Sequence, residues 1–292
     1  MIPSFVIYLR EGIEASMIIA ILLAYLKSID QRRHFRDVFV GVGAAMVLLI
    51  AGGIAAYALV HQYDGSNVQT YFETATYVLA TVTLTYMTLW MAKHARTMAS
   101  ELRARSELAL TRGNRWGLGI LAFQAVGREG LETMVFTLAI VFSSSRQAAT
   151  PVHGSLVLVG ASLGLLLSLV LAVGIYRLGT RLNLRQFFRV LGTLLIFFAA
   201  GLLADATENL QQLGWLPVGR HVLWNSSGTI LESSNVGDVL HSLLGYSDRP
   251  TALQVGVWFV FVVSSVTVFI RIGRVRAVSA DPIPSRPFTS AR

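Results

Sequence analysis

Seven long apolar stretches alternate with polar connections along the chain. The stretches cover residues 4–26, 38–61, 70–92, 117–142, 154–176, 187–212 and 252–271. A helix of about 20 apolar residues, at ~1.5 Å rise per residue, crosses a hydrocarbon core about 30 Å thick. The pattern therefore predicts an all-α integral membrane protein with seven transmembrane helices.

The composition agrees with a membrane protein. Of the 292 residues 54% are hydrophobic and only 14% are charged, whereas soluble domains carry about 25% charged residues. The chain has no cysteine, so disulfides and thiolate metal ligands play no part. The first apolar stretch has no basic residue before it and carries charges within it, so we expect a retained helix rather than a signal peptide.

The basic residues gather in alternate connections. Residues 27–36, 93–115, 177–189 and 271–292 hold 19 of the 24 lysines and arginines. Because such connections stay on the cytoplasmic side of a membrane, we predict a multi-pass protein of the cell inner membrane with a periplasmic N-terminus and a cytoplasmic C-terminus. This distribution accounts for the net charge of +8 and gives no reason to expect a nucleic-acid partner.

Outside the apolar stretches, two segments are distinct. The longest outer connection, 214–250, is predicted to contain a short helix near Val236–Leu244 and three solvated acids, Glu232, Asp238 and Asp248. The end of the chain, 277–292, contains Pro282, Pro284 and Pro287 and is predicted to be a disordered cytoplasmic tail. The remaining residues, 1–276, are predicted to form one transmembrane domain.

One five-residue string occurs twice inside the apolar stretches. It reads Arg-Glu-Gly-Ile-Glu at 10–14 and Arg-Glu-Gly-Leu-Glu at 128–132, so the two copies begin 118 residues apart. They open the first and fourth predicted helices, which cross the membrane in opposite directions. We therefore predict a 3+3 inverted-topology repeat with one helix appended, an architecture that places its binding site near the bilayer midplane.

Each string places its charges on one side of a helix. Glu11 and Glu14 are three residues apart, and Arg10 lies four residues before Glu14, so the arginine can pair with a carboxylate of its own helix. The second string repeats this spacing with Arg128, Glu129 and Glu132. Four carboxylates then meet near mid-depth if the two helices are neighbours, and Gly12 and Gly130 permit another helix to approach closely.

Oxygen-only ligands of this kind suit hard multivalent cations. The alternative is that the acids merely join helices as polar contacts. A central charge costs roughly 2.5–3.5 kcal/mol, whereas a polar contact between membrane helices returns only about 0.6–2 kcal/mol. This imbalance favours a cation-binding role for Glu11, Glu14, Glu129 and Glu132.

Three more acids lie toward the outer ends of the predicted helices. Asp205 and Glu208 are three residues apart, and Glu73 is near the start of its helix. They could form an outer mouth that attracts cations, or they could be ordinary interfacial polar residues. The six histidines lie in connections or at helix edges and are not expected to act as ligands.

The doubled string in the first and fourth of seven helices resembles the oxidase-dependent iron and lead permeases, in particular bacterial inner-membrane iron permeases. The resemblance implies that the glutamates of both strings bind and pass iron, most readily Fe³⁺, with Arg10 and Arg128 as their ion-pair partners. It also implies a separate periplasmic iron-binding protein and a haem peroxidase or other oxidase as partners. Iron is then the transported substrate, and no prosthetic group is expected.

Two other functions stay open at this point. The chain could carry another cation, such as ferrous iron, lead or manganese. It could also be a membrane-embedded di-iron enzyme, but such bundles use a Glu-x-x-His motif. Met17 and Val135 occupy the positions where that motif would place histidine, so we do not expect an enzyme.

Overall fold

The computed structural model describes residues 1–63, 65–94, 117–145, 152–178, 184–232 and 234–278. These residues form helices and no strand beyond an isolated bridge between Val222 and Thr251, so the predicted all-α class is confirmed for them. The helices are α1 (Ile2–Ser28), η1 (Arg32–His34), α2 (Phe35–His61), α3 (Asn67–His94), α5 (Gly117–Ser145), α6 (Val152–Leu178), α7 (Leu184–Gln212), α8 (Asn235–Leu244) and α9 (Ala252–Val278).

Five of the long helices are apolar enough to cross a membrane, namely α2, α3, α6, α7 and α9. The other two, α1 and α5, are of similar length, with 27 and 29 residues, but each contains the three charges of one string. The protein is therefore a multi-pass helical membrane protein. That α1 and α5 also span, which would complete the seven, stays a prediction.

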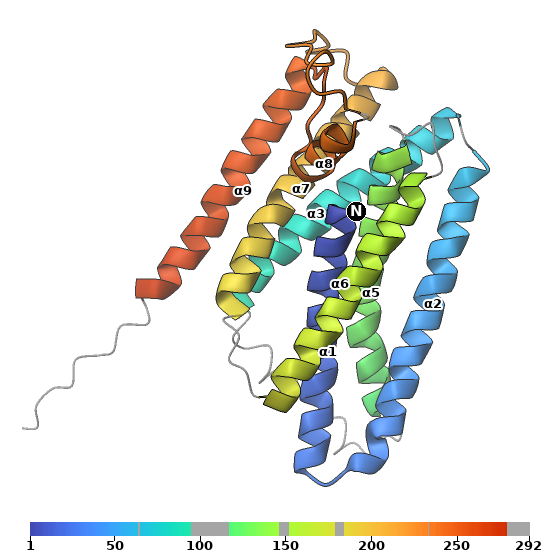
Figure 1. Ribbon diagram of the computed structural model, residues 1–292, viewed down its shortest axis with the longest axis vertical. Coiled ribbons are helices and arrows are strands. Elements are labelled where there is room, and N and C mark those ends of the chain that lie inside the picture. The colour runs from blue at the N-terminus through green and yellow to red at the C-terminus, as the bar shows by residue number, and fades with distance from the viewer. Residues whose placement is uncertain (64, 95–116, 146–151, 179–183, 233, 279–292) are drawn as a thin grey trace, which may run out of the picture.

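The long helices pack in pairs that are distant in sequence. α1 lies against α6, α2 against α5, and α3 against α7. α1 also contacts α5, so the two helices that carry the strings are neighbours. Figure 1 shows α9 and α7 on one side of the molecule and α2 on the other, with α1, α5 and α6 between them.

Glycines make this close packing possible. A Cβ atom built at Gly12 of α1 would overlap the side chain of Ser168 in α6. A Cβ atom at Gly130 of α5 would overlap Leu49 of α2. The glycine of each string therefore admits a neighbouring helix, as the sequence predicts.

Two glycines of α2 give a matched test of the packing. A Cβ atom at Gly41 would overlap the carbonyl oxygen of Gly119, whereas nothing lies within 4 Å of one at Gly43. Gly41→Ala is expected to lower the free energy of unfolding by about 1–3 kcal/mol through overpacking. Gly43→Ala is expected to raise it slightly, since alanine favours a helix by about 1 kcal/mol over glycine. Thermal unfolding of the purified variants measures both, and equal losses would contradict the α2–α5 contact.

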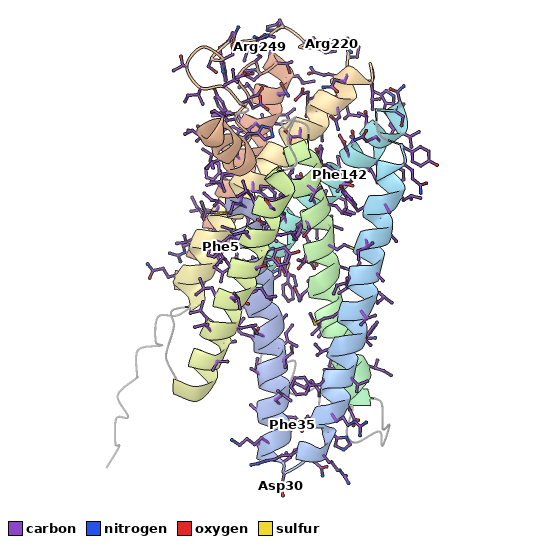
Figure 2. All side chains as sticks on the ribbon, turned by 45° about the vertical axis from the view of Figure 1, so that its right-hand side comes forward. Phe5, Asp30, Phe35, Phe142, Arg220 and Arg249 are labelled. Carbon is purple, nitrogen blue, oxygen red and sulfur yellow. The ribbon has the colours of Figure 1, made fainter. Side chains whose placement is uncertain are left out.

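The two ends of the bundle differ. At one end, here named the cap end, residues 213–251 join α7 to α9; Arg220 and Arg249 mark it in Figure 2. At the opposite end α1 turns into α2 through Asp30, which has a left-handed φ of 54°. The cap-end connection and the turn at Asp30 therefore mark the two opposite ends of the helix bundle.

Helix α8 occupies the middle of the cap-end connection. It begins after Ser234, whose Oγ accepts a hydrogen bond from the Gly237 amide at 3.0 Å, and ends at Gly245 with a φ of 71°. It contacts α7, α1 and α5. A short helix near Val236–Leu244 is thus confirmed. The predicted tail overlaps α9 by two residues, to Val278, and its remainder lies outside the described residues.

Candidate metal site

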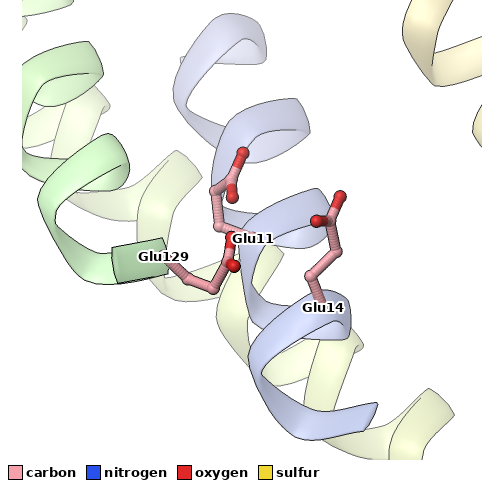
Figure 3. A group of neighbouring side chains, drawn as sticks. All are labelled: Glu11, Glu14 and Glu129. Atoms are coloured by element: carbon pink, nitrogen blue, oxygen red, sulfur yellow. The ribbon is translucent and has the colours of Figure 1, made fainter. Parts of the chain in front are cut away.

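Helices α1 and α5 bring three carboxylates of the two strings together. Glu11 and Glu14 project from α1, and Glu129 reaches them from α5 (Figure 3). One oxygen atom of each carboxylate lies within 4.8 Å of the other two, and all three side chains are buried. Acids from both strings therefore meet, in a group compact enough to hold one cation. We call Glu11, Glu14 and Glu129 the carboxylate site.

Arg10 is the counter-ion of the carboxylate site. Only 2% of the residue is exposed, its Nη1 lies 3.1 Å from Glu11 Oε1, and its Nε lies 3.1 Å from Glu14 Oε1. The predicted pairing with Glu14 is confirmed, and the contact with Glu11 is additional. With every group ionised, three carboxylates and one guanidinium carry a formal charge of −2, so the site favours a cation.

The second string is arranged differently. Arg128 Nε lies 3.2 Å from Glu132 Oε1, as predicted, but the Arg128 side chain is 47% exposed. Its guanidinium lies over the Trp90 ring, 5.4 Å from the centroid. Among the described residues, Glu132 is not in the group of three whose ligand atoms converge. This pair therefore lies at the edge of the site and adds no net formal charge.

Three carboxylate oxygens of the site have no hydrogen-bond partner among the described residues, and one of them, Glu14 Oε1, lies in the ion pair with Arg10. The other two, Glu11 Oε2 and Glu129 Oε2, are also inaccessible to solvent. An unpartnered buried polar group costs about 1–3 kcal/mol. A cation between α1 and α5 would satisfy both oxygens, and carboxylates are ligands that hard cations prefer. The residues present therefore fit a metal ion.

Two of the acids predicted at the outer mouth lie at the cap end with amide partners. Glu208 accepts a hydrogen bond from Gln254 Nε2 of α9 at 3.0 Å, and Glu73 accepts one from Gln69 Nε2 at 2.9 Å. Neither belongs to a group of three or more ligand residues within the described part of the chain. Their role at a mouth stays a prediction.

Asp205, the third predicted acid, belongs to a buried polar cluster at the cap end. Its Oδ2 accepts a hydrogen bond from Ser143 Oγ of α5 at 3.1 Å and lies 3.6 Å from His241 Nε2 of α8. On the other side of the imidazole, Nδ1 lies 3.2 Å from Glu232 Oε1 and 2.8 Å from the Tyr246 carbonyl oxygen. The cluster ties α8 to α5 and α7.

The sequence interpretation missed two members of this cluster. Histidines were not expected at a functional position, but His241 is buried between two carboxylates. Glu232 was expected to be solvated, and this is wrong, because it contacts His241 and accepts a hydrogen bond from Ser247 Oγ at 3.2 Å. The available signal was Asp205 itself, since an acid inside an apolar helix requires a polar partner.

The cluster predicts a pH-dependent stability of the cap end. Burial lowers the pKa of His241, but the neighbouring Asp205 and Glu232 raise it more, to about 9. The folded pKa exceeds the unfolded value of about 6.5, so the stabilisation is complete below pH ~6.5 and is lost as the pH rises through about 9. The difference corresponds to about 3 kcal/mol.

Hydrogen exchange of the α8 amides between pH 6 and pH 10 measures this effect once the intrinsic exchange rates are subtracted. The wild-type protein is expected to lose protection above pH 8. His241→Gln is the control, because glutamine keeps a polar side chain but does not titrate. The same pH dependence in both proteins would contradict the assigned role of His241.

Comparison with known proteins identifies the family of the chain. The Iron permease FTR1 family matches residues 1–278. A protein named ferrous iron permease EfeU from Escherichia coli O6:K15:H31 (strain 536) is 32% identical over 285 residues, covering 97% of this chain and all of the relative. A protein of the same name from Yersinia pestis is 32% identical over 282 residues, covering 96% of this chain and 97% of the relative. No solved structure matches the chain.

Proposed function

Because the chain belongs to the iron permease FTR1 family, we propose that it carries iron into the cytoplasm through Glu11, Glu14 and Glu129. The members of the family are permeases, so the chain is a transporter and not an enzyme. The observation that carries the proposal is the convergence of three buried carboxylates from α1 and α5. Glu132, Arg10 and Arg128 complete the charge balance around the ion.

The proposed path crosses seven membrane helices, arranged as two inverted repeats of three helices followed by α9. The helix pairs support this architecture. If α1 corresponds to α5 and α2 to α6 in the two repeats, then the contact between α1 and α6 corresponds to the contact between α5 and α2, and both are present. The close glycine contacts follow the same correspondence to within one residue, since Gly41 and Gly160 are 119 residues apart. Gly160 packs on Met1, and Gly41 packs on Gly119, which lies 118 residues after Met1. This is the offset between the two strings.

We assign the cap end to the periplasm and the α1–α2 turn to the cytoplasm of a bacterial inner-membrane protein. The basic residues of the connections support this orientation. An inside-negative potential then drives a cation inward by about 2.3 kcal/mol per charge for each 100 mV. A periplasmic iron-binding protein and a haem peroxidase or other oxidase, implied by the family resemblance, would deliver the ion at the cap end.

Two considerations bear on the oxidation state of the iron. Oxygen-only ligands favour the hard ferric ion, as the sequence predicts. The relatives are named ferrous iron permeases, and the formal charge of −2 at the carboxylate site would be neutralised by a divalent ion. Lead and manganese are further cations that oxygen ligands can hold. Transport assays must therefore offer each ion separately.

The test is uptake of radioactive iron by cells that lack other iron importers. Cells producing the chain are expected to accumulate iron above the empty-vector level, in the ferric arm, the ferrous arm or both. A quadruple variant, produced at the same membrane level, is expected to accumulate none above the empty-vector level; its changes are Glu11→Gln, Glu14→Gln, Glu129→Gln and Glu132→Gln. Undiminished uptake by this variant would refute the carboxylate route, and uptake of lead or manganese alone would refute iron as the cargo.

A further inference from the structure

A line of hydroxyl groups leads away from the carboxylate site along α5. Thr133 and Thr137 follow Glu129 at intervals of four residues, and Ser143 lies six residues beyond Thr137. Residues four apart share one side of a helix, and each four-residue step rises about 6 Å, whereas the six-residue step to Ser143 leads to a different side. Ser143 Oγ donates to Asp205 at the cap end. The two threonines therefore extend from the carboxylate site toward the cap end, where Ser143 belongs to the cluster with Asp205.

The threonines keep oxygen lone pairs available along this line. Thr133 Oγ1 donates its proton to the Glu129 carbonyl oxygen at 2.8 Å, and Thr137 Oγ1 donates to the Thr133 carbonyl oxygen at 2.7 Å. A hydroxyl group has one proton and two lone pairs. Once the proton is directed at the backbone, the oxygen acts toward its other neighbours as an acceptor, which is what a cation requires.

Tyr8 of α1 joins the line from the opposite helix. Its hydroxyl oxygen lies 3.1 Å from Thr137 Oγ1. Because the proton of Thr137 is already donated to its own helix, Tyr8 is the donor in this bond. Tyr8 lies three residues before Glu11 and so on the same side of α1. The pair therefore bridges the two helices that hold the carboxylates, on the side of the carboxylate site that faces the cap end.

We propose that Tyr8 and Thr137 form a second, neutral oxygen site for the iron ion, between the cap end and the carboxylate site. This inference rests on the proposed function, since it assigns a step to the same transported ion. Hydroxyl oxygens are hard ligands but carry no charge, so they hold a cation more weakly than carboxylates do. Conduction needs such weak intermediate sites, from which the ion can leave again. The unpartnered Glu11 Oε2 belongs to the residue three positions after Tyr8, and Glu129 Oε2 to the residue eight positions before Thr137.

Variants without the hydroxyl groups test the site. Thr137→Val and Tyr8→Phe are each expected to lower the maximal rate of iron uptake about tenfold, an effect typical of residues that assist a metal ligand set. Thr137→Ser keeps the oxygen atom and is expected to transport at the wild-type rate. Thr83→Val and Tyr86→Phe are matched controls, because Thr83 donates to its own helix in the same way on an exposed side of α3, and Tyr86 is exposed.

Metal binding by the purified variants separates this role from a structural one. Titration with the ion that supports uptake is expected to give wild-type affinity for Thr137→Val and Tyr8→Phe, because the carboxylate site is intact. Wild-type uptake by both variants would overturn the proposal, and so would a parallel loss of binding and thermal stability. A failure of the proposed function itself would give a different result, namely normal iron uptake by the variant in which all four glutamates are changed to glutamine.

Discussion

Glu14→Gln and Glu129→Gln are each expected to lower iron uptake about 100-fold or more, because even residues that only support a metal ligand cost 10–100-fold. Both carboxylates are buried, and their oxygens belong to the group that lies within 4.8 Å. Glutamine keeps the size of the side chain and removes its charge. Initial rates of radioactive iron uptake at equal membrane levels measure the loss.

Glu132→Gln is the matched control for this prediction. The residue is the second glutamate of its string, as Glu14 is of the other, but its side chain is 12% exposed and paired with Arg128. Its oxygens lie outside the converging group of the described residues. We expect the uptake rate of Glu132→Gln to be several-fold higher than that of Glu14→Gln, although lower than that of the wild type. Equal losses at both positions would mean that the two strings contribute equally, against the geometry.

Arg10→Met is expected to prevent the protein from accumulating in folded form. The substitution leaves Glu11 and Glu14 buried without the guanidinium that lies 3.1 Å from each. Breaking a buried ion pair by removing one partner costs about 3–5 kcal/mol, a large share of the stability of a typical protein. Size-exclusion chromatography and thermal unfolding of the detergent-solubilised protein measure the effect.

Arg128→Met provides the comparison at the equivalent position of the second string. Because the Arg128 side chain is 47% exposed, its ion pair is expected to contribute only about 0–1 kcal/mol. The variant should therefore fold and elute as the wild type does. Equal stability of the two arginine variants would mean that burial does not increase the contribution of the Arg10 ion pairs to the free energy of unfolding.

Much of the carboxylate site follows from the spacing within the strings. Spacings of three and four residues are properties of any helix, so the pairs Arg10–Glu14 and Arg128–Glu132 could be predicted and are confirmed. The glycines could be predicted for the same reason, since they mark where helices approach. The unequal burial of the two arginines could not, because nearly identical strings acquire different surroundings only when the helices pack.

The cap-end cluster was beyond prediction for a related reason. His241 and Asp205 lie 36 residues apart and on different helices, α8 and α7. No helical period links them, and their contact depends on how the connection after α7 folds back over the bundle. Ser143 comes from a third helix. The same holds for Tyr8 and Thr137, which meet only because α1 and α5 are neighbours.

The ion pair inside α1 has a consequence for biogenesis. Helix α1 is synthesised first, whereas its packing partners α5 and α6 emerge from the ribosome only after α2 and α3. In the predicted seven-helix architecture, the nascent helix stays in lipid during that interval with charged residues at its centre, each of which opposes insertion by roughly 2.5–3.5 kcal/mol. Arg10 and Glu14 are four residues apart and can neutralise each other before any partner exists. In that architecture, the contact that later belongs to the carboxylate site is expected to lower the barrier to placing the first segment in the bilayer.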